Sequence, residues 1–99
     1  MKSAFLIAAV IAVVAAAAGP VFRHGADHVR LLGSACPENI AAMVANEAVR
    51  PDLRAASALI EGKATQGCWL EFNGLVYFKW EDGDDGTVRR SSFKDEPEA

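Results

Sequence analysis

The spacing of apolar residues changes twice along this chain, from an uninterrupted apolar run to a helical repeat and then to strand-like alternation. Ile40, Met43 and Val44 lie three and four positions apart, so residues 37–48 are predicted to form a helix with one apolar face. Pro37 suits the first helical turn, where a missing N–H costs nothing, and a second proline shortly after the segment ends the pattern.

The last third of the chain predicts an antiparallel meander. Residues 67–72 and 75–80 are rich in aromatic and apolar side chains, and the Asn73-Gly74 pair between them is a strong signal for a type I′ hairpin turn. A second turn at 82–86 (DGDDG) leads to a third strand or strand-like tail at 87–93. The expected fold class is α+β, with one helix packed on a small antiparallel β-meander of three to four strands.

Residues 53–61 (LRAASALIE) are compatible with two structures. Their alanines and leucines, followed by Gly62, are typical of a helix with a glycine cap. Gly62-Lys63 is equally typical of a turn into the next strand. We favour a strand, because everything that follows is β.

The two-residue turn also predicts the register of the hairpin, with Phe72 opposite Leu75 and Cys68 opposite Lys79. We expect the face that carries Cys68 to be the inner one; its other members are Leu70, Phe72, Leu75 and Tyr77. The opposite face presents Trp69, Val76, Phe78 and Trp80, which is unusually apolar for solvent, so either another segment covers it or a partner binds it.

The N-terminal residues have the composition of an export signal. Lys2 gives a positive start, residues 4–18 contain no polar side chain, and Ala16 and Ala18 fit the −3 and −1 positions of a cleavage site. We predict that residues 1–18 are a signal peptide and that the protein is periplasmic or secreted. The alternative is an uncleaved N-terminal helix, extended by a few residues, that anchors the chain in a membrane.

Cys36 and Cys68 are the two cysteines of the chain. In an exported protein an even pair predicts a disulfide, and with two cysteines a single intramolecular pairing exists. Before the first cysteine we expect a lead-in segment at residues 19–33, in which 26–32 forms a short helix or strand. A disulfide-closed α+β domain at 34–94 and an acidic tail at 95–99 follow.

The net charge of the chain limits the classes of partner that it is expected to bind. The formal net charge is −3, and removal of Lys2 with the leader makes the remainder more negative. Nucleic acid and anionic membrane surfaces both require clustered Lys and Arg, so neither is expected as a partner, and the chain meets a membrane only during export. A basic partner is compatible with this charge.

Two groups of polar residues are candidate sites. Glu81, Asp82, Asp84 and Asp85 are typical of a solvated hairpin turn, but they also suit weak cation binding or a basic partner, although the spacing is not that of an EF-hand. On a helix, His24, Asp27 and His28 would share one face and could hold Zn²⁺ or Cu²⁺, whereas in a polar lead-in they have no such role.

Gly67-Cys68-Trp69, the strand after it, Glu81-Asp82-Gly83-Asp84 and Phe93 together resemble small uncharacterised exported proteins of Gram-negative bacteria and their phages. The resemblance implies a compact β-rich domain with one disulfide and implies no function. Arg89-Arg90 stands where such chains often have a proline.

No hydrolase, phosphate-binding or metalloprotease motif occurs in the sequence, so we expect a non-enzymatic protein without a cofactor. The favoured hypothesis is a binding or structural role in the periplasm or cell envelope, with an unknown protein or envelope component as partner. The candidate binding surface consists of Trp69, Phe78, Trp80, Glu81, Asp82, Asp84 and Asp85. Two alternatives are an acidic inhibitor of a basic, lysozyme-like secreted enzyme and a weak metal-binding protein.

Overall fold

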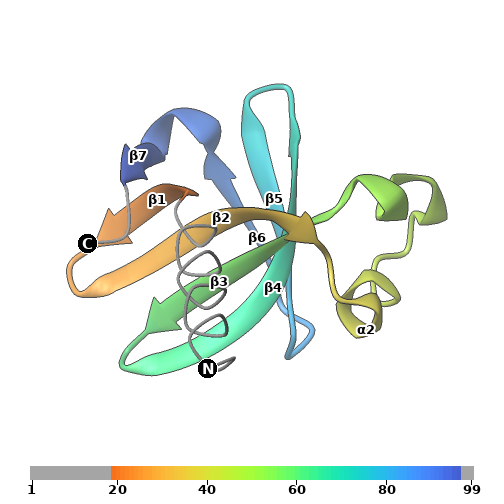
Figure 1. Ribbon diagram of the computed structural model, residues 1–99, viewed down its shortest axis with the longest axis horizontal. Helices are drawn as coiled ribbons and strands as arrows, with labels where there is room; N and C mark the ends of the chain where they lie inside the picture. Colours follow the sequence, from red (N-terminus) through yellow and green to blue (C-terminus); the bar gives the residue numbers. More distant parts are fainter. Residues whose placement is uncertain (1–18, 97–99) are drawn as a thin grey trace, which may run out of the picture.

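A computed structural model describes residues 19–96, which form one antiparallel sheet of seven strands in the order β6-β5-β4-β3-β2-β1-β7 (Figure 1). The strands are β1 (Gly19–His24), β2 (Asp27–Ala35), β3 (Arg54–Ile60), β4 (Lys63–Phe72), β5 (Leu75–Trp80), β6 (Asp85–Arg89) and β7 (Lys94–Glu96). From β1 to β6 each strand pairs with the next one in the chain, and β7 then returns to pair with β1.

The helical segments are short and lie in two connections. The α-helix α2 (Glu38–Ala41) and the 3₁₀ helix η1 (Glu47–Asp52) connect β2 to β3, and the 3₁₀ helix η2 (Arg90–Ser92) connects β6 to β7. The expected α+β class is therefore wrong: the fold is mostly β, and the sheet has seven strands rather than three to four.

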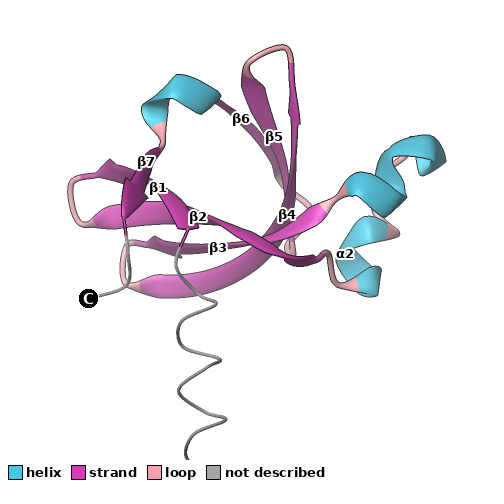
Figure 2. Cartoon of the chain, turned by 45° about the horizontal axis from the view of Figure 1, so that its top comes forward, coloured by secondary structure: helices cyan, strands magenta, loops and turns pink. Residues whose placement is uncertain are grey.

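The sheet curls (Figure 2), and the larger of two hydrophobic clusters lies on its concave face. The buried members of this concave core are Leu31, Ala56, Val76, Phe78 and Phe93, and Phe22, Val29, Trp69, Trp80 and Val88 pack around them. The chain after β6 passes through η2 to the other edge of the sheet. On the way Phe93 packs against Phe22 and Phe78, with ring centroids 5.8 and 6.3 Å apart, so both ends of the sheet contact one aromatic side chain.

The inner face of the β4–β5 hairpin is the opposite of the one expected. Phe72 and Tyr77 on the Cys68 face are 62% and 42% exposed, whereas Val76 and Phe78 on the other face are buried. The reason is that curling encloses the Trp69 face, while the α2–η1 connection is long enough to cover the Cys68 face only around Cys68 and its neighbours. The register itself is confirmed, with Phe72 opposite Leu75 and Cys68 opposite Lys79.

The helix expected over residues 37–48 shortens to one turn because local hydrogen bonds compete with it. The N–H of Ala48 donates to Asn46 Oδ1 at 3.0 Å rather than to the carbonyl of Val44. That carbonyl instead accepts from Nε and Nη2 of Arg50, at 2.9 and 2.6 Å. Asn in such a position favours a turn over a continued helix. Ile40 and Leu53 are then the side chains that bury this connection against Cys68.

The N-terminal segment belongs to the sheet. Residues 19–33, expected as a lead-in, form β1 and most of β2, and Gly25 supplies the positive φ of the turn between them. Residues 53–61 are a strand as favoured, and the Glu61-Gly62 turn that follows has positive φ at both residues, which suits a type I′ turn. The expected third strand at 87–93 spans Asp85–Arg89, and part of the acidic tail pairs with β1 as β7. The predicted signal peptide, residues 1–18, and residues 97–99 lie outside the described residues.

The predicted disulfide is confirmed, with the Cα atoms of Cys36 and Cys68 5.4 Å apart. It joins the start of the α2 connection to β4, where Cys68 is fully buried with Ile40 and Leu53. A disulfide indicates an oxidising, non-cytoplasmic environment. Within residues 19–96 no helix is long and apolar enough to cross a membrane.

The disulfide is expected to contribute a large share of the stability. Replacement of Cys36 and Cys68 together by alanine should lower the free energy of unfolding by about 3.5 kcal/mol, because the unfolded chain regains the freedom of a loop of about 33 residues. Urea denaturation of both proteins measures this change. A loss below about 1 kcal/mol would contradict it.

Gly67 is expected to tolerate no side chain. A Cβ there would lie 2.7 Å from the carbonyl oxygen of Lys79 and closer still to the ring of Trp80, which lies over the glycine. Gly67→Ala should therefore cost about 1–3 kcal/mol of stability by overpacking. Gly33→Ala is the matched control, since a Cβ at Gly33 would meet nothing within 4 Å. Equal melting temperatures for the two variants would contradict the assignment.

Candidate functional site

The concave face is incompletely filled at one end, which leaves a hollow of about 560 Å³. Every strand from β1 to β6 contributes to its wall. The apolar wall residues are Phe22, Val29, Ala58, Phe78, Trp80 and Val88. Two turns form its mouth, namely the β3–β4 turn at Glu61 and the β5–β6 turn at residues 81–84.

Small side chains in the middle of the sheet explain why this space stays open. Cross-strand pairing places Phe22, Val29, Ala58 and Thr65 in one row across β1 to β4. The two residues at the β3 and β4 end of this row are too small to reach the opposite wall. On β6, a Cβ at Gly86 would meet Trp80 Nε1 at 3.7 Å, an ordinary van der Waals distance, and the absence of a side chain at Gly86 keeps the volume beyond it free.

Trp80 is the largest side chain in the wall. Its ring stacks on Phe78, with centroids 5.0 Å apart and planes 11° apart, and its other neighbours are Gly67 and Gly86. It is half-buried, and its indole N–H makes no hydrogen bond to any of the residues from 19 to 96. Trp69 differs, because its Nε1 donates to the carbonyl of Leu32 at 2.9 Å and so ties β4 to β2. Trp69 is structural, whereas Trp80 offers a donor and an aromatic surface at the hollow.

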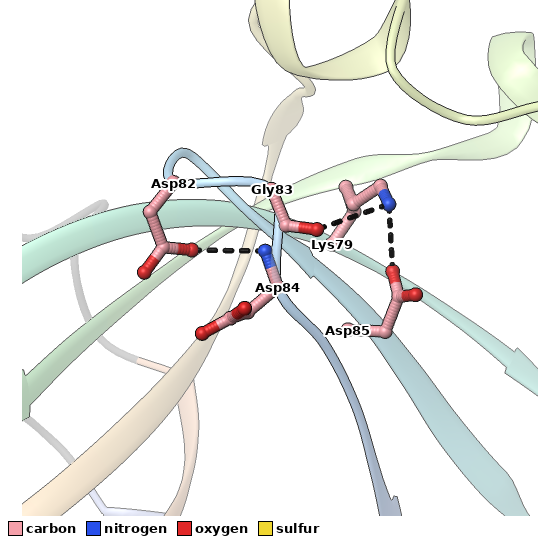
Figure 3. Close-up of polar contacts among 5 residues, drawn as sticks. All are labelled: Lys79, Asp82, Gly83, Asp84 and Asp85. Carbon is pink, nitrogen blue, oxygen red and sulfur yellow. Dashed lines mark hydrogen bonds and ion pairs between the residues drawn. The ribbon is translucent and has the colours of Figure 1, made fainter.

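The β5–β6 turn is ordered by hydrogen bonds of its own (Figure 3). The N–H of Trp80 donates to the carbonyl of Asp84 and that of Gly83 donates to the carbonyl of Trp80, both at 2.8 Å. Asp82 Oδ1 accepts from the N–H of Asp84 at 2.9 Å. Thr65 Oγ1 donates to Glu81 Oε2 at 3.1 Å, which links the turn to β4. The carboxylates of Glu81 and Asp82 are thereby held at the mouth.

Asp85 has a different environment from the other acidic residues of this turn. Its Oδ1 lies 2.8 Å from Lys79 Nζ, which also donates to the carbonyl of Gly83 at 3.3 Å (Figure 3). Asp85 contributes to a separate hollow of about 450 Å³ on the other face, between the α2–η1 connection and β5–β6, together with Met43 and Tyr77.

The structure thus divides the candidate binding surface. Phe78, Trp80, Glu81, Asp82 and Asp84 line the hollow, whereas Trp69 is absorbed into the concave core and Asp85 lies on the other face. Sequence reasoning missed Phe22, Val29, Ala58 and Gly86. For Phe22 and Val29 the signal was the alternation within residues 19–33, which predicts two further strands once the Gly25 turn is recognised. Ala58 and Gly86 gave no signal of a site.

His24, Asp27 and His28 lie on the β1–β2 hairpin rather than on a helix. His24 is opposite Asp27, whose Oδ1 accepts from the N–H of Glu61 at 2.9 Å, and His28 follows on the alternate face of its strand. The three residues border a second hollow of about 440 Å³, which shares Phe22, Val29 and Ile60 with the first. In the described part of the chain, no three His, Cys, Asp or Glu side chains gather closely enough to hold a metal ion.

The paired arginines separate in the fold. Arg89 is exposed at the end of β6, opposite Leu75. Arg90 begins η2, where its N–H donates to the carbonyl of Gly74 at 2.8 Å and its Nε lies 3.6 Å from Glu71 Oε1. Arg90 therefore has a structural role at the end of the β4–β5 hairpin.

Family models, curated proteins and solved structures were each compared with this chain, and none matches it. Its function is therefore argued from the geometry of the hollow.

Proposed function

We propose that this chain is an exported, non-enzymatic binding protein whose ligand is a small, largely apolar molecule held in the hollow of the curled sheet. The observation that carries the proposal is the hollow itself, about 560 Å³ in volume and walled by side chains from β1 to β6. Small-molecule sites are typically concave, mostly apolar and 300–1,000 Å³ in volume, with a few polar groups that orient the ligand.

The chemistry of the wall favours binding over catalysis. Phe78 at the base of the hollow is buried, and Trp80 offers both an apolar ring and a free N–H donor. The titratable groups that border the hollow, such as Glu81 and Lys63, are exposed at its rim. A ligand would therefore gain mainly from removal of apolar surface from water, roughly 25 cal/mol per Å² before the costs of association.

A neutral apolar dye tests the proposed site. N-phenyl-1-naphthylamine should bind the oxidised protein with a rise in dye fluorescence, and Gly86→Leu should abolish that rise because the new side chain fills the hollow. Gly33→Leu is the control, since it adds the same side chain at an open position away from the hollow. Circular dichroism shows whether both variants keep the fold.

Two outcomes would count against the hollow as the site. One is a wild-type protein that leaves the dye fluorescence unchanged. The other is a folded Gly86→Leu variant that binds the dye as well as the Gly33→Leu variant does.

The export part of the proposal rests on the N-terminal sequence and on the disulfide. All seven described strands lie after the predicted cleavage site, since β1 begins at Gly19. Mass spectrometry of the protein recovered from the periplasm or medium of an expressing bacterium should find a chain that starts at Gly19 with Cys36 and Cys68 joined. A full-length chain with two free thiols in the cytosol would overturn this prediction.

A further inference from the structure

The mouth of the hollow has a strong bias of charge. Glu61, Glu81, Asp82 and Asp84 border the hollow, and Lys63 is the basic residue that borders it with them. All five are exposed. The mouth therefore has a net charge of about −3, close to that of the whole chain, concentrated around one opening.

These four carboxylates are not neutralised by neighbours within residues 19–96. No Lys or Arg of the described chain lies within ion-pair distance of Glu61, Glu81, Asp82 or Asp84. Two acidic residues elsewhere do have such partners, since Asp85 pairs with Lys79 and Glu71 with Arg90. The mouth of the hollow therefore gathers four carboxylates that form no ion pair with a Lys or Arg of the described chain.

Within the mouth, the turn places its charge next to the aromatic wall. Glu81 follows Trp80 directly, and its side chain is held by Thr65, while Asp82 Oδ1 caps the N–H of Asp84. A positive group that stops at the rim would meet the carboxylates of Glu81 and Asp82, which hydrogen bonds hold in place, and would lie close to the side chain of Trp80. An anionic group would be repelled there, and a neutral group would gain no such attraction.

We infer that the ligand is an amphipathic cation, with an apolar body that occupies the hollow and a positively charged group that stays at the mouth among Glu61, Glu81, Asp82 and Asp84. The inference rests on the proposed function and adds the chemical class of the ligand to it. The apolar wall accounts for the body of the ligand, and the charge of the mouth accounts for its headgroup.

Three probes with the same apolar chain test the class of headgroup. Decylammonium, decanol and decanoate, each below its micelle concentration at pH 7, are titrated into the disulfide-bonded protein by calorimetry. Decylammonium should bind about tenfold more tightly than decanol at low ionic strength, and decanoate should bind more weakly than decanol. The preference should shrink toward parity in 0.5 M NaCl, because the rim is exposed to salt.

Charge-neutral variants locate the effect. Glu81→Gln with Asp82→Asn and Asp84→Asn keeps the hydrogen-bond acceptors of the turn and should remove most of the preference for decylammonium while decanol binds as before. Asp85→Asn is the control in the same turn, since Asp85 pairs with Lys79 and does not border this hollow; it should keep the preference. Trp80 fluorescence, read in a Trp69→Phe background where it is the remaining indole of the two in the chain, should change with each bound probe.

The outcomes separate the two proposals. Equal binding of all three probes, with a response from Trp80, would overturn the amphipathic cation and leave the hollow as an apolar site. A preference for decylammonium that survives in the triple variant would overturn the role of the mouth. Absence of binding by all three probes, each up to the highest concentration at which it stays monomeric in solution, would overturn the hollow as a site, and the inference with it.

Discussion

Phe93 packs between Phe22 of β1 and Phe78 of β5, and this contact keeps the two ends of a single sheet curled toward each other. The chain reaches that position by crossing from β6 through η2 and then pairing as β7 with β1. A flat sheet of this size would expose both faces to water. Curling lets one face bury its own side chains, so the sheet forms its core without a covering helix.

The convex face of the sheet is covered by another segment, the α2–η1 connection. The α2–η1 connection lays Ile40 and Leu53 over Cys68, and the disulfide from Cys36 holds it there. The cover is small, and beyond it Phe72 and Tyr77 remain exposed. A domain of this size buries a modest fraction of its surface, so a covalent link at the edge of the cover adds to the few apolar contacts beneath it.

The hollow follows from the same curl combined with small side chains. Ala58, Thr65 and Gly86 leave space where larger residues would have completed the core, and the turns on either side place carboxylates around the opening. The sequence alone proposed part of this site. Trp80, Glu81, Asp82 and Asp84 were candidates because aromatic and acidic residues are recognised in a sequence as potential binding residues. Alanine and glycine give no such signal, since they contribute to the site only by the volume that they leave empty. That volume exists only when the opposite wall of the hollow is in place.

What the sequence by itself determined is what depends on neighbours in the chain. The Asn73-Gly74 turn specified the register of β4 against β5, and the two cysteines specified one disulfide. Residues 53–61 were compatible with a helix or a strand, and pairing with β2 and β4 made them a strand. The tertiary structure decided what depends on distant contacts: which face of that hairpin lies inside, how far the helix after Pro37 extends, and where β7 pairs. Both faces of this hairpin carry apolar side chains, so either face could have been buried. Contacts with other parts of the chain decide which one is. Here Phe93 and the first two strands, 13 or more residues away in the chain on either side of the hairpin's inner residues, decided which face was buried.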